Sequence, residues 1–424
     1  MSYYQTLSSE ARKSILSELY ASYEDYKSRN LSLDLSRGKP NSEQLDLSSE
    51  LLTLPITKDM CFSSSGVDYR NYGILDGTAE AKALFADLLK LNKDNIFVGG
   101  NSSLQLMYDT LCRAMLFGNP DSKRPWCKED KVKWICVCPG YDRHFKITED
   151  LGFELISVPM LKDGPDMDMV EQLVKDEAVK GIWCVPKYSN PTGNTYSEET
   201  VRRLASMKCA APDFRIMWDN AYAVHDFDRN GDVLADVFEI AAEYGNEDRI
   251  MYYSSTSKIS FPGSGVAIVA ASKKNLDDLK RYTGTQTIGY DKINQIRHVE
   301  FFKNAENMYE HMLKLGAKIK AKFDITLNAL ENLSELGIAE WTKPCGGYFV
   351  SLDMIIGKAS RVYELMQNAG VVLTKVGATF PYGKDPEDKN LRIAPTYPTD
   401  SDLALACEIL VLAIKIAALE ELTK

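Results

Sequence analysis

The sequence predicts an α/β fold in which helices cover both faces of a mostly parallel sheet, and two observations support this prediction. Short apolar runs alternate with stretches of helical periodicity between residues 69 and 299, a pattern typical of parallel strands joined by crossover helices. The chain has 424 residues, a length that exceeds the size of one ordinary domain, and 45% of its residues are hydrophobic. We therefore expect a large domain over residues 54–299 and a smaller α+β domain built from residues 1–53 and 300–424.

Seven apolar runs are the candidate strands of the large domain, and amphipathic segments such as 103–116 and 197–207 lie between them. The seven runs are residues 95–98, 133–137, 153–158, 181–185, 215–218, 250–253 and 266–270. Ligands of such sheets bind beyond the carboxyl ends of the strands. The residues that directly follow these runs are therefore the first candidates for a functional site.

The small domain is expected to combine helices with a few short strands. Residues 31–35 read as an extended piece that crosses between the domains, and residues 300–333 form a long helical stretch. A strand is expected at 346–352, a helix at 361–369 and a short strand at 371–374, before a final helix.

Charge and hydropathy argue against two classes of partner. The formal net charge is −10 and the basic residues are scattered, so we expect no nucleic acid partner. Residues 1–20 lack the apolar segment of a secretory signal. The apolar stretch 403–419 is interrupted by Glu408 and Lys415, which favours a helix packed on the protein over a membrane span.

The cysteines indicate a reducing, cytoplasmic environment. The nine cysteines have no regular spacing, and several lie inside apolar runs, which is typical of reduced core thiols. Cys136 and Cys138 share one face of a predicted strand, but no second cluster of Cys or His supplies the four ligands of a structural zinc site. We therefore expect no metal.

Lys258 is the first candidate for catalysis, since it follows the apolar run 250–253 in the segment Ser255-Thr256-Ser257-Lys258. A lysine amine can bond to an aldehyde as an imine and can later carry protons as a free amine. Ser255 and Ser257 are placed to meet a phosphate. Taken alone, this segment is also compatible with a surface lysine after a turn.

Asp219 and Tyr222 follow the run 215–218. A carboxylate at a buried strand end needs a partner, and a protonated pyridine nitrogen would keep a bound ring cationic and electron-withdrawing. Tyr222 could donate to the oxygen of the same ring. The alternatives are a helix-capping aspartate and a tyrosine that only packs.

Three further segments add polar groups at predicted strand ends. Asn190 heads the turn Asn190-Pro191-Thr192-Gly193 and could donate to the same ring oxygen, although it could also serve the turn alone. Gly99 and Gly100 lead into a helix start at Ser102, Ser103 and Leu104, where free N–H groups suit an anion. Tyr141 follows another strand and could stack on a flat ring or fill core.

Arg392 lies in the apolar segment Leu391-Arg392-Ile393-Ala394. A buried guanidinium needs a partner, and its planar fork fits a carboxylate with two hydrogen bonds. We therefore predict that Arg392 binds the α-carboxylate of a substrate, the alternative being an internal salt bridge.

Read together and in this order, these residues resemble the fold-type I enzymes of the class I/II aminotransferase family, which depend on pyridoxal 5′-phosphate (PLP). The resemblance covers the chain from Ser36-Arg37-Gly38 to Arg392. It implies that Lys258 bonds to PLP and moves the proton, that Asp219 pairs with the pyridine nitrogen, and that Tyr141 stacks on the ring. It also implies two contacts from Tyr222 and Asn190 to the ring oxygen.

The same resemblance assigns the remaining contacts. Ser102, Ser103, Ser255 and Ser257 become candidate phosphate ligands, and Leu104 also belongs to the cofactor-binding set. Gly38 lies near the substrate carboxylate. Tyr72, five residues before Gly77, matches a tyrosine that reaches the phosphate of the neighbouring subunit, which implies a homodimer with shared active sites.

Two positions depart from the family pattern. Many relatives carry a phosphate-binding arginine seven or eight residues after the lysine, where this chain has Gly265 and Val266, so that Ser264 or a basic residue elsewhere must replace it. Position 37 is usually apolar and here is Arg37. This combination resembles a divergent bacterial branch of aspartate aminotransferases.

The predicted reaction is a ping-pong transamination in which an amino acid, with aspartate favoured, gives its amino group to a 2-oxo acid such as 2-oxoglutarate. A distal substrate carboxylate needs a second cation, for which Arg37 is favoured over Arg70, Lys292 and Arg297. The alternatives are a PLP-dependent lyase that carries out β-elimination and a transaminase for aromatic or other amino acids. A non-catalytic regulatory domain and a nucleotide-binding protein are disfavoured, since the lysine, aspartate and tyrosine are all present and no Gly-x-Gly-x-x-Gly occurs.

Overall fold

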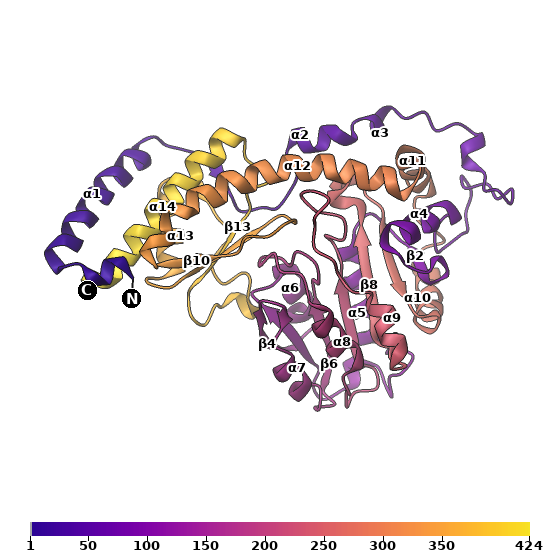
Figure 1. Ribbon diagram of the computed structural model, residues 1–424. Helices are drawn as coiled ribbons and strands as arrows, with labels where there is room; N and C mark the ends of the chain where they lie inside the picture. The colour runs from indigo at the N-terminus through magenta and orange to yellow at the C-terminus, as the bar shows by residue number, and fades with distance from the viewer. Residues whose placement is uncertain (1) are drawn as a thin grey trace.

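The computed structural model describes residues 2–424, and an eight-stranded sheet forms the core of the larger of its two parts (Figure 1). In spatial order the strands are β2 (Ile96–Val98), β9 (Ala267–Ala271), β8 (Ile250–Ser255), β7 (Arg215–Asp219), β6 (Val179–Cys184), β3 (Lys133–Cys138), β4 (Glu154–Leu161) and β5 (Gly164–Pro165). The seven predicted strands are confirmed. The sequence did not predict β5, because Gly164-Pro165 carries no strand pattern.

The strand directions place most carboxyl ends at one edge of the sheet. Strands β8, β7, β6, β3 and β4 run parallel. Strand β9 is antiparallel to both β8 and β2, so that β2 again points the same way as β8. Every residue of β6, β7, β8 and β9 is buried, as expected for strands of a mostly parallel sheet that is covered on both faces.

Helices form one layer on each face of this sheet, as predicted. Successive side chains of a strand point to opposite faces, so Ile216 and Trp218 belong to one apolar cluster and Met217 to the other. The cluster of Ile216 and Trp218 includes side chains of α4 (Ala79–Leu89), α7 (Met167–Leu173), α8 (Glu198–Ser206) and α9 (Val237–Glu243). The cluster of Met217 includes side chains of α5 (Ser103–Phe117), α6 (Asp142–Asp150) and α10 (Lys273–Gln286).

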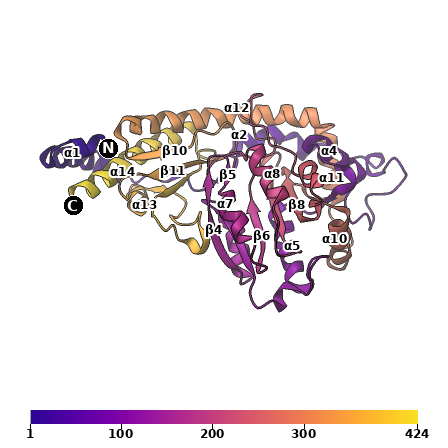
Figure 2. The ribbon, with the colours of Figure 1, turned by 60° about the horizontal axis from the view of Figure 1, so that its bottom comes forward.

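The second part of the molecule contains two small sheets. Strands β10 (Ala339–Trp341), β11 (Val350–Met354) and β13 (Asn390–Ile393) form an antiparallel sheet, and β1 (Leu33–Asp34) pairs with β12 (Val371–Val372). The extended piece predicted at residues 31–35 therefore joins this part. Helices α1 (Ser9–Ser28), α13 (Ala359–Asn368) and α14 (Asp400–Thr423) complete it, with α1 lying beside α14 (Figure 2).

Helix α12 (Ala305–Leu330) spans both parts, because it packs on α14 at one end and on α4 at the other (Figure 1). The short helices α2 (Ser42–Leu45) and α3 (Glu50–Thr53) follow the same route. The helical stretch predicted at 300–333 is interrupted. Helix α11 (Lys292–Phe302) is followed by Lys303, whose φ is +65°, and Asn304 then caps α12. The division at 299 falls within α11 and stays a prediction.

Within residues 2–424, no helix combines the length and the apolar content needed to cross a bilayer. Helix α14 is strongly apolar, and most of its apolar side chains are buried against the other elements of the second part.

Asp213, just before β7, links the start of that strand to β6 and to the segment before β3. Its side chain is 2% exposed and accepts hydrogen bonds from Ser122 (2.7 Å), Trp126 Nε1 (2.7 Å) and Lys180 Nζ (2.9 Å). Lys180 belongs to β6 and is equally enclosed. A buried pair of this kind is costly to break, because removal of one partner leaves an uncompensated charge in the interior.

We predict that Asp213→Ala lowers the free energy of unfolding by about 3–5 kcal/mol, since it leaves the Lys180 ammonium buried without its carboxylate. Asp277→Ala is the matched control, because Asp277 pairs with Lys273 on the surface of α10, where such pairs contribute about 0.5 kcal/mol or less. Urea unfolding of both variants measures the difference. Equal losses of unfolding free energy in the two variants would show that the buried Asp213–Lys180 pair stabilises the fold no more than a surface ion pair does.

Candidate active site

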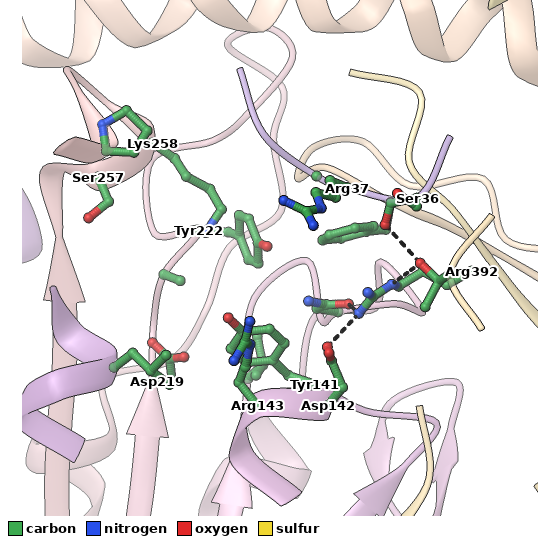
Figure 3. Close-up of a pocket in the computed structure, with 18 of the residues that line it drawn as sticks. Ser36, Arg37, Tyr141, Asp142, Arg143, Asp219, Tyr222, Ser257, Lys258 and Arg392 are labelled. Carbon is green, nitrogen blue, oxygen red and sulfur yellow. Dashed lines mark hydrogen bonds and ion pairs between the residues drawn. The ribbon is translucent and has the colours of Figure 1, made fainter. Parts of the chain in front are cut away.

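A cavity of about 690 Å³ lies at the carboxyl edge of the central sheet, between that sheet and the second part of the molecule. All of the predicted site residues except Tyr72 line it. They are Arg37, Gly38, Ser102, Ser103, Leu104, Tyr141, Asn190, Asp219, Tyr222, Ser255, Ser257, Lys258 and Arg392. Figure 3 shows Lys258 and Asp219 on one side of the cavity and Arg392 on the other.

Lys258 closes the one-turn helix η7 (Thr256–Lys258) that directly follows β8. Its Nζ lies 5.1 Å from the ring centre of Tyr222, and within residues 2–424 it forms no ion pair. Burial lowers the pKa of Lys258, and the negative charge of Asp219 opposes this effect only in part. The amine is therefore more often neutral, and hence nucleophilic, than that of an exposed lysine.

Asp219 is the last residue of β7 and is 4% exposed. Its Oδ2 accepts a hydrogen bond from His144 Nε2 at 3.0 Å, and its Oδ1 has no partner within residues 2–424. His144 therefore supplies a partner for one of the two carboxylate oxygens, which the sequence did not predict. The other oxygen remains free to accept a hydrogen bond from a group in the cavity.

His144 is a site residue that sequence reasoning missed. It lies in the first turn of α6 and stacks on Trp183 of β6 with ring centres 4.3 Å apart and planes 10° apart. The ring is thereby fixed edge-on to Asp219. Its only signal in the sequence is its position three residues after Tyr141 at a predicted strand end.

Tyr141 and Tyr222 supply neutral hydroxyl groups to the site. Burial raises the pKa of Tyr141 to about 12 and raises that of Tyr222 well above its ordinary value. Both therefore remain protonated hydrogen-bond donors at neutral pH.

Hydroxyl groups and a helix N-terminus meet in one corner of the cavity. Ser102 precedes α5, and its hydroxyl makes no capping hydrogen bond, so the first N–H groups of α5 lack a side-chain partner there. Ser255 donates to Ser257 (3.1 Å), and Ser257 donates to the carbonyl of Asn101 (3.1 Å). Hydroxyls beside free N–H groups at a helix start suit a phosphate group.

The structure does not offer Ser264 as a replacement for the missing arginine. Its hydroxyl donates to Asn294 Oδ1 at 3.2 Å, and it does not line the cavity. The cations that line the cavity besides Lys258 and Arg392 are Arg37, Arg143 and Lys375. Sequence reasoning missed Arg143 and Lys375, because neither lies in an apolar segment that marks a buried charge.

Arg392 lies in β13 and is held on several sides. Its Nη1 donates to Asp142 Oδ1 (2.9 Å) and Asn190 Oδ1 (3.3 Å), and its Nε donates to Thr374 Oγ1 (3.3 Å). The guanidinium carbon lies 5.1 Å from the ring centre of Phe349. The internal salt bridge that the sequence left as an alternative is present, and its partner is Asp142 (Figure 3).

Gly38 and Arg37 form the wall of the cavity opposite the sheet. A Cβ atom on Gly38 would lie 2.3 Å from the ring of Phe349, so only glycine allows this close approach. Arg37 is exposed and forms no ion pair with any residue from 2 to 424. Figure 3 shows its guanidinium on the opposite side of Tyr222 from Ser257.

Tyr72 lies outside this cavity and is 83% exposed. It lines a separate surface hollow together with Arg70 and Lys292, and Lys292 donates to the carbonyl of Gly73 at 3.0 Å. Arg297 lies on α11, also away from the main cavity. Of the four cations considered for a distal carboxylate, only Arg37 lines the cavity of the same chain.

No group of three or more His, Cys, Asp or Glu side chains between residues 2 and 424 is arranged to bind a metal ion.

Comparisons with known proteins agree on one family. A family model described as aspartate amino-transferase matches residues 7–424. An aspartate aminotransferase of Corynebacterium glutamicum is 47% identical over 399 residues, which cover 94% of this chain and 92% of that protein. The crystal structure of an aspartate transaminase from the same species covers 99% of both chains, with a TM-score of 0.96 at 45% identity.

A more distant structure shares the fold alone. The α-aminoadipate aminotransferase of Thermus thermophilus, solved with N-(5′-phosphopyridoxyl)-L-leucine, is 21% identical and has a TM-score of 0.72, covering 91% of this chain and 92% of that chain.

We predict that Lys258 of the ligand-free protein titrates below the usual lysine value of 10.5, because burial disfavours its charged form. Asp219→Asn should lower the pKa of Lys258 further, since it removes the negative charge that favours the ammonium. The pH dependence of acetylation at Lys258, followed by mass spectrometry, measures both values. A higher pKa in the variant would contradict this electrostatic picture.

Proposed function

The chain belongs to the aspartate aminotransferase family, and from this membership we propose that it is a PLP-dependent transaminase that moves the amino group of aspartate to 2-oxoglutarate by a ping-pong mechanism. The predicted fold type and the aminotransferase activity are confirmed by the family match and by the relatives. The coenzyme, the substrates and the residue roles below are our proposal.

One observation carries the proposal. A lysine without an ion pair and an aspartate with one free, buried oxygen line the same cavity. A pyridine N–H would satisfy Asp219 Oδ1, which is otherwise an orphaned acceptor in the interior. The hydroxyls and free N–H groups at the start of α5 supply a phosphate seat in the same cavity. The donor set therefore fits PLP at both ends.

Bound PLP would supply an electron sink for the carbanion that forms at the substrate Cα. Lys258 would hold the coenzyme through its amine and afterwards carry the proton at Nζ to and from the substrate carbon. His144 would keep the Asp219 carboxylate turned toward the ring nitrogen. Tyr222 would donate its hydroxyl proton to the ring oxygen, and Tyr141 would stack on the ring.

The orientation of Asn190 supports its proposed contact. Its Oδ1 accepts from Arg392 Nη1 at 3.3 Å, so its Nδ2 is the amide group left to donate to the ring oxygen. Arg392 would bind the substrate α-carboxylate, with Gly38 leaving room beside it. One contact thus links the substrate-binding arginine to the coenzyme-binding amide.

Charge in the cavity favours a dicarboxylic substrate. Besides Lys258 and Arg392, three basic residues line the cavity, and none of them forms an ion pair within residues 2–424. These residues are Arg37, Arg143 and Lys375. Arg37 remains our choice for the distal carboxylate, because it lines the same cavity as Arg392 and is exposed.

The exposed position of Tyr72 supports the proposed homodimer. Most of the Tyr72 side chain is left uncovered by residues 2–424, whereas in a dimer it would reach the phosphate of the neighbouring site. The division into a large domain, 54–299, and a small domain, 1–53 and 300–424, is part of the same proposal.

The test of function uses the coenzyme-saturated protein. We predict that borohydride fixes the coenzyme to Lys258, and that aspartate with 2-oxoglutarate yields oxaloacetate and glutamate without ammonia. Lys258→Ala should lower kcat by at least about 10³-fold, since both the covalent link and the proton carrier are lost. Borohydride labelling elsewhere, or release of ammonia in place of a 2-oxo acid, would contradict the proposal and favour a lyase.

We predict that Arg37→Ala lowers kcat/KM for aspartate and glutamate by about 10- to 100-fold, the effect of losing a hydrogen bond to a charged group. Turnover of alanine and phenylalanine should change by less than about 3-fold, because they have no distal carboxylate. Arg143→Ala provides the comparison among the remaining cations. Equal losses for all four substrates would remove Arg37 from the specificity role.

A further inference from the structure

Arg392 already binds a carboxylate before any substrate arrives. Asp142 Oδ1 lies 2.9 Å from its Nη1 (Figure 3). Asp142 is the first residue of α6, directly after Tyr141, whereas Arg392 comes from β13 in the other part of the molecule. The ion pair therefore places an internal carboxylate at the group that we propose as the receptor for the substrate α-carboxylate.

Most N–H groups of the Arg392 guanidinium already have an acceptor, so a substrate carboxylate would compete with Asp142 for them. A guanidinium has five N–H groups, one on Nε and two on each Nη. Thr374 takes the Nε hydrogen, and Asp142 and Asn190 take both hydrogens of Nη1. Only the Nη2 hydrogens lack an acceptor among residues 2–424. A carboxylate that bridges two nitrogens of the fork must therefore displace one of the three acceptors.

Asp142 is the acceptor that can leave at the lowest cost. Its side chain is 34% exposed, so its carboxylate can turn into water. Asn190 is 5% exposed, and the hydroxyl of Thr374 also donates to the carbonyl of Ser36 at 2.8 Å. Asp142 is also chemically equivalent to the incoming group, so that one carboxylate replaces another on the same donor.

We propose that Asp142 is an internal competitor for the α-carboxylate, which keeps Arg392 oriented in the empty site and weakens the binding of every substrate and product. The inference rests on the proposed role of Arg392. It follows that loss of the Asp142 charge tightens carboxylate binding, whereas a residue that merely supported the fold would weaken binding when replaced. Because amino acids and 2-oxo acids share the α-carboxylate, both should gain affinity by a similar factor.

The test measures binding of succinate, a dicarboxylate that cannot react, to the coenzyme-saturated protein by calorimetry. Asp142→Asn should lower the dissociation constant of succinate by about 3- to 10-fold. This factor lies between the effect of losing an exposed ion pair and that of losing a hydrogen bond to a charged group. The KM values for aspartate and 2-oxoglutarate should fall by a similar factor, with kcat changed by less than about 2-fold. Asp142→Ala, which removes the acceptor altogether, should show at least the same gain.

Two controls separate the competing explanations. Glu149→Gln changes the net charge by the same amount on the same helix, where Glu149 faces Lys146, and should leave succinate binding unchanged. In an Arg392→Ala background, Asp142→Asn should have no effect, because the pair no longer exists. Unchanged or weaker binding in both Asp142 variants, or an equal gain in Glu149→Gln, would overturn the inference.

The succinate measurement is independent of turnover, so it also separates this inference from the proposed function. If the protein shows no transaminase activity but Asp142→Asn binds succinate more tightly, the inference is supported and the proposed function is contradicted. If the protein transaminates normally but neither Asp142 variant binds succinate more tightly, the proposed function is supported and the inference is contradicted.

Discussion

The parallel alignment of the central strands is the constraint on which the site depends. Because β3, β6, β7 and β8 point the same way, the residues that follow them emerge at one edge, although they are separated by up to about 120 positions in the chain. Tyr141, Asn190, Asp219 and Lys258 each lie at or just beyond such an end. The apolar clusters on both faces fix the strands, and the strands in turn fix the distances between these side chains.

Electrostatic balance shapes the cavity as much as its geometry does. The cavity holds a lysine whose pKa is lowered by burial and a carboxylate whose one hydrogen-bond partner among residues 2–424 is His144. Such groups are costly in a folded protein unless a ligand completes them, which is why their coexistence in one cavity is informative about function. Arg392 shows the opposite arrangement, because its charge is already balanced by Asp142.

The two parts of the molecule contribute different chemistry. The central sheet supplies every group proposed to hold the coenzyme within one chain, whereas β13 and the segment before α2 supply Arg392, Arg37 and Gly38 for the substrate. Helix α12 packs on both parts and therefore helps to fix the relative position of these two sets of residues. The contact between Arg392 and Asn190 joins them directly.

The sequence by itself determined the seven main strands, the strand-end residues and the family, because apolar periodicity and residue order are local properties that survive without coordinates. It placed Asp219, Lys258 and Arg392 in the site for the same reason. It could not find His144, whose role depends on stacking against Trp183 about 40 residues away. Nor could it show that Arg392 has an internal partner, Asp142. Only the tertiary structure shows these contacts. The hydrogen bonds from α6 to Asp219 of β7 and to Arg392 of β13 depend on how elements that are distant in the chain pack together, and no local sequence pattern records that packing.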